Sequence, residues 1–161
     1  MRTLPRQGYT LMELVIYIAL LAFLLLFVVS GTIATYRAFT LARIDQRLVI
    51  NGDNAFATLI RDVRSATSLD AVSSVFGSSP GTLVVGAKRY TLSDGRLQLI
   101  EGSTIQNITA SNASVTDLQF YRSTTTTGTE LVTVRMTLQA GSGVLQRSRQ
   151  YYGSVLLRGE Y

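Results

Sequence analysis

Two residue types that supply many catalytic and metal-binding groups are missing from this chain of 161 residues, which has no cysteine and no histidine. Without cysteine there is no disulfide scaffold, no thiolate metal site and no cysteine nucleophile. Without histidine the commonest general base is absent, together with Ser-His-Asp triads and histidine-bound metals. Lys88 is the one lysine, which leaves little room for Ser-Lys chemistry, and Asp117 and Glu130 are isolated rather than clustered at metal spacing. The composition argues against an enzyme and predicts neither a cofactor nor a metal.

Charged residues are also absent from one long stretch, because residues 14–36 contain none. As a helix this run measures about 35 Å, enough to cross the hydrocarbon core of a bilayer. Glu13 stands at its start, where a carboxylate is costly in lipid unless it is paired. The sequence predicts a transmembrane helix over residues 9–36.

The net charge of the chain is +5, and the short leader at residues 1–8 carries two of the arginines, Arg2 and Arg6. Positive charge before the apolar run favours retention of the leader in the cytoplasm, so that the C-terminal part is translocated. A positive balance can attract DNA, an acidic polymer or anionic lipid, but the remaining arginines are scattered, which is typical of a solvated surface. A secretory signal is disfavoured because the apolar run is longer than the hydrophobic region of a typical signal and Glu13 interrupts its start. A simple signal anchor explains the length of the run but neither Gly8 nor Glu13.

Gly8 is followed by Tyr9-Thr10-Leu11-Met12-Glu13-Leu14 and then by the uncharged run. This arrangement resembles the class III signal of type IV prepilins and type II secretion pseudopilins. In that family a short basic leader ends in glycine, and glutamate is the fifth residue after the cut. Counted from Tyr9, Glu13 is that residue. The resemblance covers the leader and the N-terminal helix, and it departs from the family at Tyr9, where phenylalanine is usual.

The resemblance implies cleavage between Gly8 and Tyr9 by a prepilin peptidase, N-methylation of Tyr9, and assembly through the N-terminal helix. It implies a structural subunit that crosses the inner membrane once, with its C-terminal domain outside the cytoplasm, and then enters a periplasmic or extracellular filament. The implied partners are other pilin or pseudopilin subunits, the peptidase and the inner-membrane assembly platform. A rival hypothesis is a membrane-tethered binding or adhesion module that never polymerises.

The chemistry of Glu13 suggests a role within such a filament. Cleavage would expose an α-amine on Tyr9, and the amine of a neighbouring subunit is a natural partner for the Glu13 carboxylate. Opposite charges that are desolvated together attract strongly, and such a pair would fix the register between helices. The simpler alternative is a carboxylate that reaches back to the lipid headgroups.

Downstream of the apolar run, the sequence predicts a globular domain over residues 37–161. Apolar residues recur at three- and four-residue spacing along an amphipathic helix at about 37–69, with one longer gap between Leu48 and Ala55. Short alternating segments separated by turn signals follow at about 82–158, and Asp94-Gly95 is the strongest hairpin signal among them. The expected fold is α+β and pilin-like: a long helix packed on an antiparallel sheet.

Several local features carry expectations of their own. Gly31 favours a bend or a loosened turn in the first helix, and Asn51-Gly52-Asp53-Asn54 is expected to weaken the second. Arg61, Asp62 and Arg64 are interpreted as a solvated face. Asn107 and Asn112 begin Asn-x-Ser/Thr patterns, and four tyrosines at positions 90, 121, 151 and 152 are expected in core or strand-pairing roles before ligand stacking.

The downstream layout also has a loose resemblance to J-type minor pseudopilins and PilW-like minor pilins. It rests on three segments, at residues 59–66, 90–97 and 154–158. This resemblance favours a minor subunit over a major one.

Overall fold

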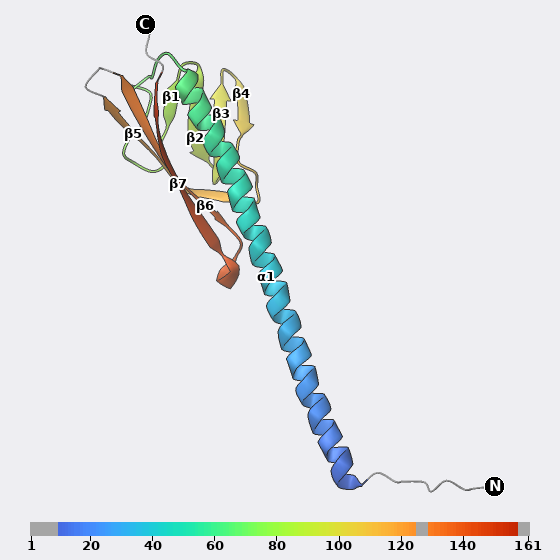
Figure 1. Ribbon diagram of the computed structural model, residues 1–161. Helices are drawn as coiled ribbons and strands as arrows, with labels where there is room; N and C mark the ends of the chain where they lie inside the picture. Colours follow the sequence, from blue (N-terminus) through green and yellow to red (C-terminus); the bar gives the residue numbers. More distant parts are fainter. Residues whose placement is uncertain (1–9, 125–128, 158–161) are drawn as a thin grey trace, which may run out of the picture. The chain divides into compact units, whose positions relative to one another are not determined.

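The computed structural model describes residues 10–124 and 129–157, so the predicted cleavage and methylation positions, Gly8 and Tyr9, lie outside the described residues. Its contacts divide the chain into two compact units, an N-terminal unit (Met1–Leu41) and a C-terminal unit (Ala42–Tyr161). Helix α1 (Leu11–Ser65) contributes to both (Figure 1). The C-terminal unit adds the strands β1 (Leu83–Val85), β2 (Lys88–Ser93), β3 (Arg96–Glu101), β4 (Thr104–Asn107), β5 (Ser114–Thr124), β6 (Glu130–Ala140) and β7 (Arg147–Leu156), and the short 3₁₀ helix η1 (Gly143–Leu145).

The predicted α+β class is confirmed, whereas the expectation of a single sheet is wrong. The strands form a four-stranded sheet in the order β1-β2-β3-β4 and a three-stranded sheet in the order β5-β6-β7, and all of the pairings are antiparallel. The division falls after β4, whose four residues are all exposed. The backbone that follows is held by other partners: Ile108 N–H donates to Leu97 O at 2.8 Å, and Ala110 N–H donates to the Asn51 side chain at 2.9 Å.

The predicted hairpin at Asp94-Gly95 joins β2 to β3. Asp94 and Gly95 both have positive φ, at 50° and 68°, and Ser93 faces Arg96 across the turn. Two consecutive left-handed residues give a turn whose twist matches that of the flanking strands, and Asp-Gly adopts this turn at low cost.

The apolar stripe predicted on the second half of α1 is confirmed in the C-terminal unit, where Ile44, Leu48, Ala55, Leu59 and Val63 are buried. These side chains share one core with the inner faces of both sheets, in which Tyr90 and Phe120 are the largest fully buried side chains. The helix ends at Ser65, before the predicted limit at residue 69, and Leu69 forms an isolated bridge with Val85 instead.

Two expected weak points in the helix are not found. α1 continues without interruption through Gly31 and through residues 51–54. Asn51 and Gly52 are themselves buried and fill the gap in the apolar stripe. The buried stripe is therefore continuous. Two of its positions are a polar residue and a glycine, so a search for hydrophobic residues alone leaves a gap there.

Candidate functional site

The N-terminus of α1 is built around Thr10 and Glu13. Thr10 directly precedes the helix, and its hydroxyl accepts a hydrogen bond from the backbone N–H of Glu13 at 3.3 Å. This is one half of a capping box, in which the threonine at the N-cap satisfies a donor that the helix cannot. The glutamate in the first turn also lies in the favourable field of the helix dipole. Glu13, which the sequence analysis identified as an assembly residue, thus also stabilises the start of the helix.

Glu13 has a second contact within the same helix. The hydroxyl of Tyr17, one turn further on, donates to Glu13 Oε1 at 3.2 Å. Over residues 10–124 and 129–157, none of the ion pairs involves Glu13. The carboxylate is thus hydrogen-bonded but has no cationic partner within the described chain.

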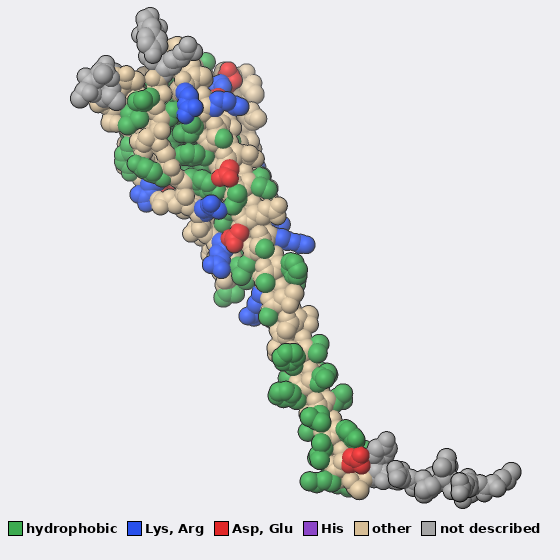
Figure 2. Space-filling view, in the orientation of Figure 1, with side chains coloured by type: hydrophobic (Ala, Val, Ile, Leu, Met, Phe, Trp, Pro, Cys, Tyr) green, Lys and Arg blue, Asp and Glu red, His purple; other side chains and the backbone are tan. Residues whose placement is uncertain are grey.

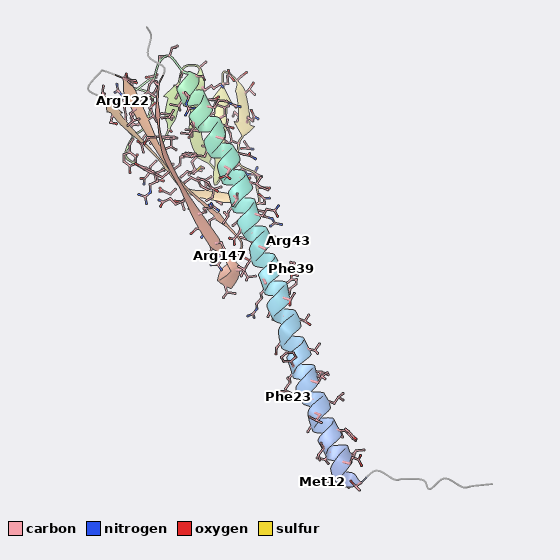
Figure 3. The ribbon with its side chains drawn as sticks, viewed as in Figure 1. Met12, Phe23, Phe39, Arg43, Arg122 and Arg147 are labelled. Carbon is pink, nitrogen blue, oxygen red and sulfur yellow. The ribbon has the colours of Figure 1, made fainter. Side chains whose placement is uncertain are left out.

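The part of α1 in the N-terminal unit presents apolar side chains on all sides. No residue in its most apolar window is buried, and the helix is long and apolar enough to cross a membrane. Figure 3 shows Met12, Phe23 and Phe39 projecting outward from this segment. The hydroxyls of Thr32 and Thr35 donate to the backbone carbonyls of Val28 and Gly31, both at 2.9 Å.

These internal hydrogen bonds satisfy polar groups that lipid cannot. Along the same segment runs a shallow groove of about 510 Å³, lined by Phe27, Val28, Gly31, Thr32, Thr35, Tyr36 and Phe39. Small residues on a membrane helix allow a second helix to approach closely. The N-terminal unit can therefore lie in a bilayer or pack against apolar helices.

A second polar centre lies in the C-terminal unit, where α1 faces the four-stranded sheet. Asp62 is 8% exposed, and its Oδ2 accepts hydrogen bonds from the Tyr90 hydroxyl at 2.5 Å and from Lys88 Nζ at 2.9 Å. Arg61 Nε lies 3.6 Å from Asp62 Oδ1. The prediction that residues 61–64 form a solvated face is therefore wrong for Asp62, although Arg61 and Arg64 are exposed.

The sequence interpretation missed Asp62 because its partners, Lys88 and Tyr90, are distant in the chain. Alternation along β2 places both side chains on the same face of the strand, since they are two residues apart. The buried face of α1 includes position 62 beside position 63. The single lysine is thus used in a structural ion pair.

The pKa values in this cluster follow from burial and hydrogen bonding. Burial opposes ionisation of Asp62, but the hydrogen bonds from Tyr90 and Lys88 and the charges of Lys88 and Arg61 outweigh it, so the pKa of Asp62 lies below its usual value. Burial, and then the hydrogen bond and negative charge of Asp62, raise the pKa of Tyr90. The cluster therefore holds a carboxylate and a neutral phenol over the whole physiological pH range.

A recess of about 370 Å³ opens beside this cluster, lined by Asn54, Thr58, Arg61, Asp62, Lys88, Leu99, Glu101, Gln106, Asn107 and Ile108. Its wall mixes positive, negative and amide groups, so no single charge dominates it. Within the part of the chain that the structure describes, no three acidic residues are grouped closely enough to hold a metal ion.

Asn51 is a third polar contact of α1 and another residue that the sequence interpretation assigned to a weak point. Its side-chain amide donates to Arg47 O at 2.8 Å and to Asn112 Oδ1 at 3.0 Å, and its Oδ1 accepts from Ala110 N–H at 2.9 Å. These bonds connect the helix to the segment between the two sheets. Asn112, one of the two Asn-x-Ser/Thr positions, is thus engaged within the fold.

The four tyrosines divide into two pairs. Tyr90 is fully buried, and Tyr151 packs over Gly52 and donates to Leu48 O at 3.0 Å, so these two have the predicted core roles. Tyr121 and Tyr152 are 42% and 71% exposed. Tyr121 donates to Gln119 within its own strand at 2.6 Å.

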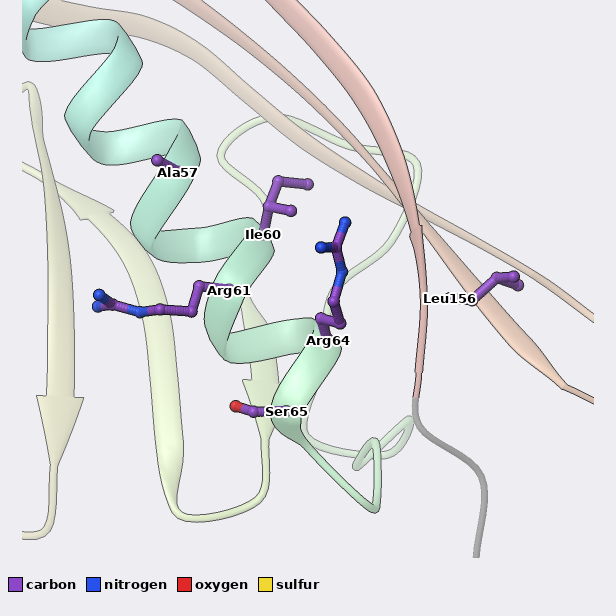
Figure 4. A pocket seen from close by; sticks show the side chains of 6 residues that line it. All are labelled: Ala57, Ile60, Arg61, Arg64, Ser65 and Leu156. Atoms are coloured by element: carbon purple, nitrogen blue, oxygen red, sulfur yellow. The ribbon is translucent and has the colours of Figure 1, made fainter.

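Figure 4 shows a larger groove of about 760 Å³ between the end of α1 and β7, lined by Ala57, Ile60, Arg61, Arg64, Ser65 and Leu156. Ile60 and Arg64 project from the helix toward β7, whereas Arg61 projects from the helix in the opposite direction.

Comparison with protein families, with curated proteins and with solved structures finds no match to this chain.

Proposed function

We propose that this chain is a non-enzymatic structural subunit of a type IV pilus-like or type II secretion pseudopilus filament, and that it is a minor subunit. A prepilin peptidase would cut between Gly8 and Tyr9 and Tyr9 would be N-methylated. The observation that carries the proposal is the fixed spacing of Gly8, Glu13 and the uncharged run at residues 14–36.

Two structural observations support an assembly role for the helix. The part of α1 in the N-terminal unit presents apolar side chains on all sides, which suits it first to lipid and then to a bundle of similar helices. Glu13 stands at the start of that helix without a cationic partner in residues 10–124 and 129–157. An α-amine on a neighbouring subunit would supply the missing charge.

The proposal is tested by the variant Glu13→Gln, expressed in cells that hold the cognate peptidase and assembly platform. The change keeps the volume and hydrogen-bonding capacity of the side chain but removes its charge. Cleavage and membrane insertion should continue, whereas incorporation into sheared filaments should fall sharply. Glu13→Leu should show the same defect, since charge rather than shape is removed in both.

Tyr17→Phe is the matched control, because it removes only the hydroxyl that donates to Glu13. It should leave incorporation close to that of the unaltered chain. Immunoblots of cleaved, membrane-resident and filament fractions measure all three variants. Normal incorporation of Glu13→Gln beside normal cleavage would show that Glu13 is not the assembly contact and would favour a membrane-tethered module.

A further inference from the structure

An ordered turn in the C-terminal unit connects β6 to β7 and lies against α1. Gly141 has a φ of +85°, and a Cβ placed there would come within 2.9 Å of Ile44 Cδ1 and 2.6 Å of Leu145 O. The absence of a side chain thus lets the turn lie directly on the helix. Leu145 packs against the core, and its N–H donates to Ser142 O at 3.2 Å. The position of this turn on α1 is therefore fixed by packing and hydrogen bonding.

Val144 lies in this turn and is 98% exposed, although its neighbour Leu145 is partly buried and packs against the core. A single exposed apolar residue is ordinary by itself. Here, however, the turn holds the valine outward on a short 3₁₀ helix, η1, rather than on a loose loop. The turn presents one apolar side chain at a defined place.

Four exposed arginines lie on the two elements beside this turn. Arg43 and Arg47 are close in sequence to Ile44 on α1, and Arg147 and Arg149 lie on the part of β7 that pairs with the end of β6. Figure 3 shows Arg43 on α1 and Arg147 on β7, and Figure 2 shows basic side chains, with acidic ones between them, over the C-terminal unit. Asp45 is the acidic residue between the two helix arginines in sequence. Arg149 lies over the Tyr151 ring at 5.7 Å. Within residues 10–124 and 129–157, none of these four arginines belongs to an ion pair.

A chain anchored by its long apolar helix keeps its C-terminal unit tethered to a membrane, which makes lipid a candidate partner for this surface. Anionic headgroups attract arginine, and an apolar side chain at a protein tip can enter the boundary between headgroups and acyl chains.

We propose that Val144 and the arginines at positions 43, 47, 147 and 149 form a docking surface for anionic phospholipid. This inference rests on membrane anchoring by the first part of α1 and not on cleavage or filament assembly, so the two proposals can fail separately.

The surface makes a measurable electrostatic prediction. Each arginine close to an anionic surface raises the docked-to-undocked ratio by about fivefold, and salt screens this attraction within about 8–10 Å. Reversing two of the four charges should lower the ratio by at least about tenfold, since each reversal both removes an attraction and adds a repulsion.

The absence of cysteine makes a site-specific test possible in the full chain. Val144→Cys carries an environment-sensitive fluorophore, and the protein is reconstituted into vesicles of phosphatidylcholine with or without phosphatidylglycerol. Val72→Cys is the matched control, because Val72 is 96% exposed on the turn that follows α1 in the same unit. In anionic vesicles the fluorescence emission of the probe at position 144 should shift to shorter wavelength and be quenched by lipid-borne quenchers. The probe at position 72 should show neither change, because it stays exposed to water.

The charge requirement is tested with Arg43→Glu/Arg147→Glu against Arg89→Glu, which reverses an exposed arginine on β2. The double variant and high salt should both abolish the shift at position 144, and Arg89→Glu should not. A water-exposed probe at 144 in anionic vesicles would overturn the proposal. Equal quenching in zwitterionic vesicles would also overturn it. A shift that appears only when chains are crowded in the bilayer would overturn it in favour of contact between subunits.

Discussion

The close contact between Gly52 and Tyr151 gives the sharpest test of how α1 is held in the C-terminal unit. An ideal Cβ on Gly52 would lie 2.0 Å from Tyr151 Cζ and 2.3 Å from its hydroxyl oxygen. Carbon atoms in contact are normally about 3.5–4.0 Å apart, so Gly52→Ala must displace the ring by more than about 1 Å. That displacement also breaks the hydrogen bond from Tyr151 to Leu48 O.

The change in unfolding free energy for Gly52→Ala combines two destabilising contributions and one stabilising contribution. Overpacking costs about 1–3 kcal/mol and the lost hydrogen bond about 1 kcal/mol, whereas alanine is favoured over glycine within a helix by about 1 kcal/mol. Gly52→Ala should therefore destabilise the C-terminal unit by about 1–3 kcal/mol, against its helix propensity. Circular dichroism of the detergent-solubilised full chain should show a melting temperature lower by at least about 3 °C.

A double-mutant cycle isolates the contact. In a Tyr151→Ala background the obstacle is gone, so the same Gly52→Ala change should be neutral or stabilising. Gly31→Ala, where no atom lies within 4 Å of the new Cβ, should not lower the melting temperature. An equal effect of Gly52→Ala in both backgrounds, or stabilisation in the unaltered chain, would refute the packing described for Gly52.

Three further predictions concern polar contacts of α1. Asp62→Ala should lower the free energy of unfolding by about 2–3 kcal/mol, because the buried Tyr90 hydroxyl loses its acceptor and Lys88 its counter-charge; adding Tyr90→Phe should recover part of this loss in chemical denaturation. Folding lowers the pKa of Asp62, so the carboxylate contributes to stability above about pH 4 and this contribution is lost as the pH falls below that value. The difference in unfolding free energy between the unaltered chain and Asp62→Asn should therefore narrow in acid. A difference that stays constant with pH would contradict the ion pair assigned to Asp62. Asn51→Leu suits the apolar stripe but should lower the free energy of unfolding by about 1–2 kcal/mol, since Ala110 N–H loses its acceptor. Asn54→Ala, on the exposed side of the helix, should have little effect in thermal melts. Equal effects of the two variants would contradict the role of Asn51.

The parts of the fold that local sequence determines were predictable. The uncharged run, the three- and four-residue spacing after it and the Asp94-Gly95 turn each depend on neighbouring residues, and the structure contains the corresponding helix and hairpin. The hydrogen bond between Glu13 N–H and the Thr10 hydroxyl also depends on neighbouring residues at capping-box spacing, but it was not among the predictions.

The parts that depend on distant partners were not predictable. Asp62 has the sequence context of a surface charge, and only the approach of β2 brings Lys88 and Tyr90 to it. Asn51 and Gly52 are poor helix formers by propensity, but one is fixed by hydrogen bonds to a distant segment and the other makes room for Tyr151. The division into two sheets likewise depends on contacts after β4 rather than on strand propensity.

We propose that this chain is a prepilin-like subunit, which its intact mass after expression in membranes with a prepilin peptidase tests directly. Residues 1–8 should be lost and Tyr9 should become the new N-terminus, with an added methyl group where the enzyme also methylates. A Gly8→Val control should stay uncut, because a β-branched side chain crowds the extended backbone that the peptidase must reach. Persistence of the unaltered chain at full length, or a cut after Gly31, would contradict the account.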